Sequence, residues 1–187
     1  MESHQIATHC SPRPAAGRAI NIRWYTEKME KLPLITLARA TAKDIDTFLE
    51  LERSVDGTPI YSAMIDRNEA LAEIEKSIVY LIYENGRAVG STMYEMKTPD
   101  QSYISGLVVH PDAQGRDIGR AAMIKILEEL KNVPIIDLVT HPDNMRAIKL
   151  YESLGFSLGE RIENYYGDGE PRVVMTLNHP EQNSTSH

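Results

Sequence analysis

The segment VVHPDAQGRDIGRAAM, residues 108–123, connects a β-rich run to an amphipathic helix through a short loop that contains Pro and Gly. A strand pattern precedes it at 102–109, a helix pattern follows at 117–132, and a second strand pattern follows at 134–140. Strand, helix and strand in this order predict a parallel βαβ unit. The loop presents free backbone N–H groups and the positive end of a helix, so a phosphate is its natural ligand, although any βα connection also needs small residues.

A second informative segment is THPDNMRAIKLYESLGF, residues 140–156, which predicts a helix that ends at Gly155. Asn144 and Tyr151 lie seven residues apart. That spacing places their side chains about 20° apart on one face of a helix. Ala147 lies between them and leaves room for another group to approach. The same residues also suit a structural role, with Asn144 as the N-cap and Tyr151 as a half-buried core aromatic.

The remaining pattern extends this unit into a larger sheet. Residues 34–40 predict a strand, and Thr41 predicts the cap of a helix whose apolar residues recur at helical spacing. Residues 59–77 predict one long helix or two broken ones, and Asn85 with Gly86 predicts a hairpin between two strands. Two final strands are expected at 156–163 and 172–177. The expected fold class is α/β, with a mixed sheet of about seven strands and about four helices.

Composition places the chain among ordinary globular proteins, with 42% hydrophobic and 25% charged residues. No apolar run reaches the roughly 18–20 residues that cross a bilayer, and the net charge of −7 argues against a nucleic-acid partner. The N-terminal residues lack the apolar middle of a secretory signal, and the single Cys10 cannot form an internal disulfide, so a cytoplasmic location is expected. We expect one domain at 34–178, a mobile N-terminal extension at 1–33 and a polar tail at 179–187.

Both informative segments resemble the two sequence motifs of the GNAT superfamily of N-acetyltransferases. QGRDIGRAA is similar to the pyrophosphate-binding signature of that family at Gln114 and Gly119, and the order of elements from Leu34 to Leu177 also fits. The second segment is similar to the family's other motif at Asn144, Ala147, Leu150, Tyr151, Gly155 and Phe156. The resemblance implies the GNAT fold and an enzyme that moves an acetyl group from acetyl-CoA to a primary amine by direct attack.

The resemblance also implies a cofactor site. The strand that carries Val108 should diverge from the strand that carries Leu138, and the pantetheine arm should lie in the opening, where a backbone N–H polarises the thioester carbonyl. One departure is Asp117, which replaces the first glycine of the signature. Its carboxylate either repels the diphosphate or points to solvent. The implied cofactor-binding residues are Leu107, Val108, Val109, Gln114, Gly115, Arg116, Ile118, Gly119, Arg120 and Asn144.

Catalysis is expected to depend on tyrosine. Tyr151 supplies a phenol that stays protonated at neutral pH and can protonate the departing thiolate. The general base is open, because Tyr103 stands where many family members carry Glu. Tyr103, Asp137 and Glu95 are the candidates, with Tyr103 first among them, and each also suits a structural role. No metal site is predicted.

The segment RIENYYGDGEPRVVM, residues 161–175, bears on the acceptor. It resembles the tyrosine-bearing hairpin that walls the peptide groove of ribosomal-protein and protein N-terminal acetyltransferases. Tyr165 and Tyr166 are therefore the expected substrate-binding residues and a peptide α-amine the expected acceptor, with an exposed turn as the alternative. A small-amine acetyltransferase acting on a polyamine, aminoglycoside or amino acid, and a non-enzymatic acyl-CoA binding module, also remain open. The expected partners are acetyl-CoA and an amine, and the chain is expected to be a monomer or homodimer.

Overall fold

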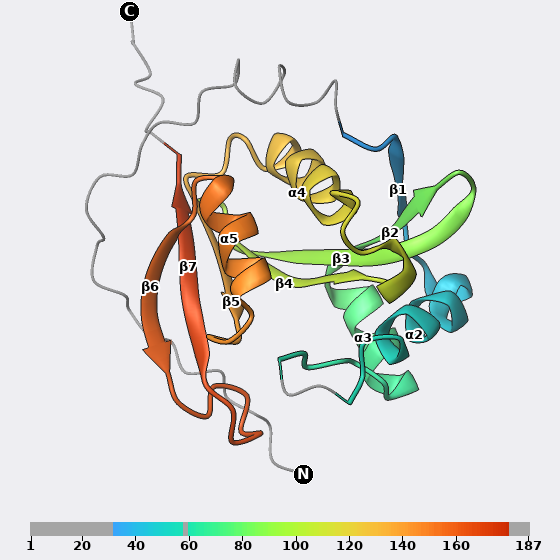
Figure 1. The fold of residues 1–187 in the computed structure, drawn as a ribbon, viewed down its shortest axis with the longest axis horizontal. Helices are drawn as coiled ribbons and strands as arrows, with labels where there is room; N and C mark the ends of the chain where they lie inside the picture. Colours follow the sequence, from blue (N-terminus) through green and yellow to red (C-terminus); the bar gives the residue numbers. More distant parts are fainter. Residues whose placement is uncertain (1–31, 58–59, 180–187) are drawn as a thin grey trace, which may run out of the picture.

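The computed structural model describes residues 32–57 and 60–179, which form a seven-stranded mixed sheet with helices on both faces (Figure 1). The expected α/β class is confirmed, with four α-helices among the described residues. The expected extension at 1–33 and tail at 179–187 lie almost entirely outside the described residues. The elements are β1 (Ile35–Arg39), η1 (Ala42–Asp44), α2 (Ile45–Arg53), α3 (Arg67–Lys76), β2 (Ile78–Glu84), β3 (Arg87–Thr98), β4 (Gln101–Val109), η2 (Pro111–Ala113), α4 (Ile118–Glu129), β5 (Ile135–Thr140), α5 (Met145–Ser153), β6 (Ser157–Ile162) and β7 (Arg172–Asn178).

The strands follow the order β1-β2-β3-β4-β5-β7-β6. Neighbouring strands of the described sheet are antiparallel, except that β4 and β5 run parallel and are joined by α4. This pair is the βαβ unit expected from the sequence. The expected hairpin between β2 and β3 is also confirmed, because Asn85 and Gly86 have φ values of 50° and 80°, as a tight hairpin turn requires.

The helix expected over residues 59–77 is wrong in its first half. α3 begins only at Arg67, because the Asp66 side chain accepts hydrogen bonds from backbone N–H groups of the first turn and so starts the helix there. Residues 60–66 belong to no helix or strand. One backbone N–H of this segment donates instead to the carboxylate of Glu52 at 3.1 Å. The segment is therefore fastened to the end of α2.

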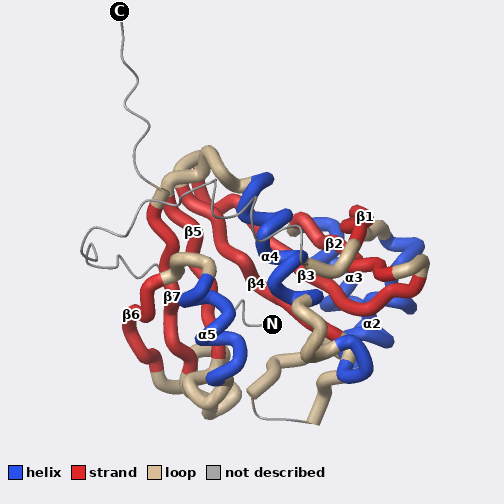
Figure 2. The backbone as a smooth tube through the Cα atoms, turned by 45° about the horizontal axis from the view of Figure 1, so that its top comes forward, coloured by secondary structure: helices blue, strands red, loops and turns tan. Residues whose placement is uncertain are grey.

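Helices cover both faces of the sheet. α4 and α5 pack on one face in a core that includes Ile104 and Tyr151, whereas α2 and α3 pack on the other around Phe48 and Met93. Figure 1 shows α4 on one side of β3 and β4, and α2 with α3 on the other. Figure 2 shows that the β6–β7 turn and the segment between α2 and α3 lie at the same end of the molecule. Within the described ranges, no helix is long and apolar enough to span a membrane.

Candidate active site

The two parallel strands diverge in the middle of the sheet. Their ladder ends at the pair Ile104 and Leu138, although β4 continues to Val109. In the β3–β4 ladder the register shifts at the same point, which leaves Ser105 as an extra residue of β4. Such a bulge bends a strand locally. The divergence expected from the sequence is therefore present, and it coincides with the bulge.

A cleft of about 970 Å³ occupies this opening. It extends from the loop before α4, past β4, to the segment after α2 and the β6–β7 turn. Arg116 and Tyr165 are not among the described residues that line it. The lining includes twelve residues expected at the site: Tyr103, Leu107, Val108, Val109, Gln114, Gly115, Ile118, Gly119, Arg120, Asn144, Tyr151 and Tyr166.

The loop before α4 is shaped by two residues in the left-handed region, Gly115 with φ 81° and Asp117 with φ 57°. Alternating left-handed and right-handed residues form a concave backbone that suits an anion. Gln114 fastens this loop, because its Nε2 donates to the carbonyl of Val109 at 3.0 Å and its Oε1 accepts from Arg146 at 3.0 Å. The Gln114 side chain thus stabilises the conformation of this loop through hydrogen bonds within the protein.

The departure at Asp117 has a conformational explanation. The left-handed region favours glycine, and Asp is one of the few other residues that tolerate it. The Asp117 side chain is 65% exposed and lies 3.5 Å from Arg120, which also donates to Ser153 on α5 at 2.8 Å. Arg116 pairs with Glu84 on β2 at 3.0 Å. Of the two arginines, Arg120 faces the cleft and Arg116 is held at the neighbouring strand.

Asn144 and Tyr151 both line the cleft from the α5 side. Asn144 is the N-cap of α5, since its Oδ1 accepts from the backbone N–H of Ala147 at 3.2 Å, so its structural role is confirmed. Tyr151 is only 7% exposed. Burial raises the pKa of its phenol well above the ordinary value, and nearby Tyr61 adds to the rise. The hydroxyl stays protonated at neutral pH, as a proton donor requires.

Tyr103, the first candidate for the base, lines the end of the cleft next to the β6–β7 turn and the segment 60–64, which we call the acceptor end after the role expected for it. Its hydroxyl is 3.2 Å from the hydroxyl of Tyr166. Burial raises the pKa of Tyr103 well above its usual value, and the neighbouring Tyr166 and Tyr165 raise it further. A phenol of this kind donates hydrogen bonds near neutral pH rather than accepting a proton.

The two carboxylate candidates are also engaged. Burial favours a raised pKa for Glu95, but hydrogen bonds from Lys97 and Lys76 outweigh it and hold the pKa below its usual value. Asp137 lies outside the described cleft lining and accepts hydrogen bonds of 2.6 Å from side chains on β4 and β7. Each candidate therefore has a structural partner that competes with a role as base.

Arg172, which sequence reasoning missed, joins the two walls of the acceptor end. Its guanidinium donates to the Ser62 hydroxyl at 2.5 Å, in the segment after α2, and to the Asp168 carboxylate at 2.9 Å, in the β6–β7 turn. It also lies 5.2 Å from the ring centroid of Tyr166, within cation–π distance. Tyr165 packs edge-on against Tyr166, with centroids 4.8 Å apart. Tyr166 thus faces the cleft, and Tyr165 supports it.

Two more buried polar residues of the cleft, Glu52 and His141, were also missed. The Nε2 of His141 lies 3.2 Å from Glu170 in the β6–β7 turn, and its Nδ1 accepts from the backbone N–H of Asp143 at 3.1 Å. Both ring nitrogens of His141 are therefore occupied, and the side chain ties the end of β5 to the turn. Neither His141 nor Arg172 carries a sequence signal of its own, because each depends on a contact with a distant segment.

Glu52 did carry a signal. It extends the apolar stripe of α2 by one further step, since the buried positions of that helix follow the spacing of a helical face. A glutamate at such a position is rarely buried without a reason. The apolar residues of this stripe are Ile45, Phe48 and Leu49, and Glu52 follows them on the same face of the helix.

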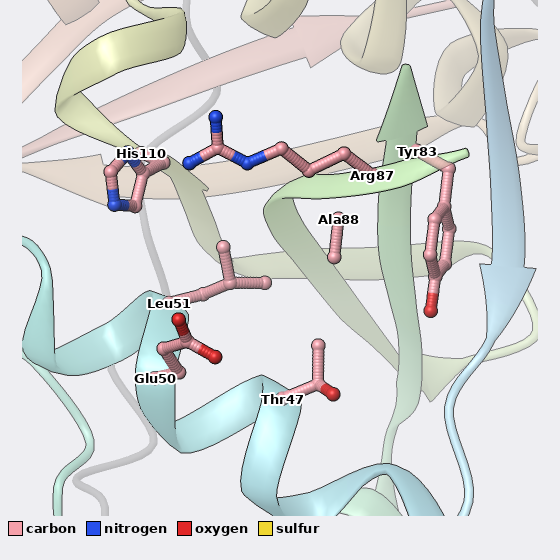
Figure 3. Close-up of a pocket in the computed structure, with 7 residues that line it drawn as sticks. All are labelled: Thr47, Glu50, Leu51, Tyr83, Arg87, Ala88 and His110. Atoms are coloured by element: carbon pink, nitrogen blue, oxygen red, sulfur yellow. The ribbon is translucent and has the colours of Figure 1, made fainter. Parts of the chain in front are cut away.

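A second, smaller hollow of about 320 Å³ lies between α2 and the β2–β3 hairpin (Figure 3). Its titratable side chains are Glu50, Tyr83, Arg87 and His110. None of its lining residues is shared with the cleft, and none is a residue expected at the site. Among the described residues, no group of three or more His, Cys, Asp and Glu side chains is arranged to hold a metal ion.

Several named proteins are similar in sequence to most of this chain. It is 26% identical over 147 residues to [ribosomal protein bS18]-alanine N-acetyltransferase of Escherichia coli strain K12, across 76% of this chain and 96% of that protein. It is 27% identical over 148 residues to an uncharacterised N-acetyltransferase of Methanocaldococcus jannaschii, across 77% of this chain and 92% of that protein.

Solved structures show the same fold. The ribosomal-protein-S18-alanine N-acetyltransferase of Escherichia coli superposes with a TM-score of 0.68 and 24% identity, across 82% of this chain and 99% of that one. An acetyltransferase of Salmonella typhimurium, solved with its cofactor acetyl-CoA, superposes with a TM-score of 0.65 and 20% identity, across 82% and 98%.

The family comparison covers the loop before α4, the diverging strands and α5 together. The sequence profile of the Acetyltransferase (GNAT) family matches residues 45–156, which is more than half of the chain. The opening between β4 and β5, the loop before α4 and the buried Tyr151 all lie within or beside this match. The chain therefore belongs to the GNAT family and is an acetyl-CoA dependent N-acetyltransferase.

Proposed function

We propose that the chain acetylates the α-amine of a peptide or protein N-terminus. The observation that carries this proposal is the wall at the acceptor end, where Arg172 and Tyr103 hold Tyr166 against the cleft. A tyrosine wall offers apolar area and hydroxyl groups to an extended main chain. The Escherichia coli relative, which is named for the alanine of ribosomal protein bS18, supports the same class of acceptor.

Each part of the cleft has one task in the proposed reaction. Backbone N–H groups of residues 115–120 bind the diphosphate, and residues 107–109 line the pantetheine arm and polarise the thioester carbonyl through the main chain. Tyr151 holds the proton that the departing thiolate needs. Tyr166 contacts the peptide, and Tyr165 keeps it in position. The cleft of about 970 Å³ is large enough to take a cofactor arm and an acceptor together.

Protonation also favours an α-amine. The reference pKa of a peptide α-amine is about 7.7–8.0, so part of it is neutral near pH 7, whereas a lysine at about 10.4 is almost wholly charged. The charged fraction would be attracted by the acidic side of the cleft. That side is lined by Glu52, Asp56, Glu69, Glu73 and Glu95.

The same acidic lining supports a second candidate acceptor. A small polyamine carries several positive charges and would be attracted more strongly than a peptide with one. The tyrosine wall would then act only as one side of the cleft.

We place the catalytic unit at residues 34–178 and propose a monomer or homodimer that works in the cytoplasm.

The experiment is an acceptor panel with acetyl-CoA and a measurement of free coenzyme A release. The panel contains peptides with Ala, Ser and Met N-termini, the same peptides with blocked N-termini, spermidine and an amino sugar. We expect the free N-terminal peptides to be turned over fastest and their blocked forms not at all. Faster turnover of spermidine or the amino sugar than of every peptide would replace this proposal by the second candidate.

A further inference from the structure

Glu52 is a buried carboxylate that has no cationic partner among residues 32–57 and 60–179. It lies in the last turn of α2 and is 3% exposed. Its Oε2 accepts from the backbone N–H of Met64 at 3.1 Å, and its Oε1 accepts from the Ser91 hydroxyl at 3.2 Å. No lysine, arginine or histidine of the described residues forms an ion pair with it. Burying an unpaired carboxylate is unfavourable, and such groups in a cleft are candidates for functional sites.

The position of Glu52 relative to the reacting groups follows from the sheet register. Ser91, its partner on β3, pairs with Val108 on β4. Glu52 therefore lies one strand away from the main chain assigned to the thioester, on the face covered by α2. Tyr151 comes from α5 on the opposite face. Both side chains line the one cleft that opens between β4 and β5.

We propose that the Glu52 carboxylate is the general base that takes a proton from the acceptor amine. The proposal rests on the acetyl transfer proposed above. The ammonium loses a first proton to Glu52, which frees the lone pair to attack the thioester carbon. As the N–C bond forms and the C–S bond breaks, the amine loses its second proton to water, and Tyr151 supplies the proton that the sulfur takes. Solvent restores both side chains, so one proton ends on the thiol and one in water.

The surroundings of Glu52 suit this task. Burial raises its pKa above the usual glutamate value, and the hydrogen bonds from Met64 and Ser91 oppose only part of the rise. A base whose pKa is closer to the working pH accepts a proton more readily. The other titratable side chains that line the cleft on α3, β3, β4 and the segment after α2 are Glu69, Glu73, Lys76, Glu95, Tyr103, Asp56 and Tyr61.

The main test compares Glu52→Gln with Glu50→Gln, an exposed neighbour on the same helix that carries the same charge. The amide keeps an acceptor for the Met64 N–H but cannot take a proton. For Glu52→Gln we expect kcat/KM at pH 7 to fall about 100 to 1000-fold. The loss should shrink above about pH 8, where the α-amine is already neutral. Binding of acetyl-CoA and Tm should stay at the wild-type values, and Glu50→Gln should match the wild type throughout.

A second variant reports on the base without removing it. Ser91→Ala deletes a hydrogen bond that lowers the pKa of Glu52, so its pKa should rise further. The carboxylate is active only when deprotonated, and the acid limb of the kcat/KM profile should therefore move to higher pH. This measurement stands even where Glu52→Gln does not fold.

Two results would overturn the assignment. One is a kcat/KM of Glu52→Gln without the expected pH dependence: a wild-type value at pH 7 would give Glu52 no role in the reaction, and a loss equal at every pH would mark it as a positioning residue. The other is an acid limb that does not move in Ser91→Ala. All assays use the acceptor that the wild type turns over fastest among the peptides, spermidine and the amino sugar. Failure of the peptide proposal and failure of the Glu52 proposal are therefore separate outcomes.

Discussion

The two ends of the cleft are built in different ways. The end proposed to bind the cofactor is formed mainly by residues close together in sequence, 107–109 and the loop before α4, whose backbone is shaped by Gly115 and Asp117. The acceptor end is made by side chains from separate segments that meet only in the folded chain, as Arg172 does with Ser62. The conformation of a backbone site is determined by residues close together in sequence, whereas a side-chain site depends on tertiary contacts between distant residues. Substitutions should therefore affect the two ends independently.

The largest effect is expected where the two ends meet. Tyr151→Phe keeps the packing of the ring and removes the proton, so kcat should fall about 100 to 10,000-fold while acetyl-CoA binding is unchanged. Because the pKa of Tyr151 is raised, its hydroxyl is protonated throughout the neutral range, and the loss should be flat between about pH 6 and 9. Steady-state kinetics and calorimetry measure both quantities. A variant with the wild-type rate would show that Tyr151 is only a core residue.

At the acceptor end, Arg172→Ala should affect stability and peptide binding together. The guanidinium is buried, and its loss leaves Asp168 and Ser62 without their partner, at a cost of about 3 kcal/mol. Tm should fall by about 6–12 °C. KM for the peptide should rise at least about tenfold and KM for acetyl-CoA by less than about twofold.

The control for this variant is Arg161→Ala, which removes an exposed arginine whose partner is Glu163. It should leave Tm and both KM values unchanged, because exposed ion pairs contribute little. Equal increases in the two KM values for Arg172→Ala would contradict the separation of the two ends.

At the cofactor end, Gly115→Ala should weaken acetyl-CoA binding. Gly115 has φ 81°, a backbone conformation that an alanine adopts at a cost of about 1–2 kcal/mol, equivalent to about five- to thirtyfold in Kd if the loop shifts. Gly86→Ala is the matched control, since Gly86 has φ 80° at the tip of the β2–β3 hairpin. Both variants should lose similar stability, and only Gly115→Ala should change the Kd measured by calorimetry. A similar Kd for the two would place the diphosphate elsewhere.

The smallest effect is expected for Asp117→Asn. The amide tolerates the left-handed conformation and removes the negative charge beside the proposed diphosphate. Acetyl-CoA should bind about two- to threefold more tightly at low salt, and the gain should disappear at high salt because the side chain is exposed. Asp112→Asn, on η2, removes another exposed charge and should have no effect. Weaker binding by Asp117→Asn would mean that the carboxylate helps to order the loop through Arg120.

Local patterns predicted most of the fold, including the loop and helices around the proposed cofactor site. The βαβ unit, the hairpin at Asn85 and Gly86, and the N-cap at Asn144 each depend on residues close together in sequence, and all are present. The helix expected at residues 59–77 was wrong in part, because the side chain of Asp66 caps α3 and the helix therefore begins only at Arg67.

The acceptor end could not be predicted in the same way. The contact between Arg172 and Ser62 joins residues 110 positions apart, and the contact between Glu52 and Ser91 joins residues 39 positions apart. Glu52 alone could have been found, since its place on the apolar stripe of α2 marks it as buried. For Arg116 no local pattern indicated its partner either, because the ion pair with Glu84 joins it to a distant strand, and its contact with the diphosphate stays a prediction.

The most direct test of the account is the position of the transferred acetyl group. A peptide with a free Ala N-terminus and one internal lysine is incubated with the protein and acetyl-CoA, and tandem mass spectrometry locates the product. The account predicts acetylation of the α-amine alone, and a large loss of this product in Tyr151→Phe. Acetylation of the lysine, or an unmodified peptide under conditions in which spermidine is acetylated, would contradict it.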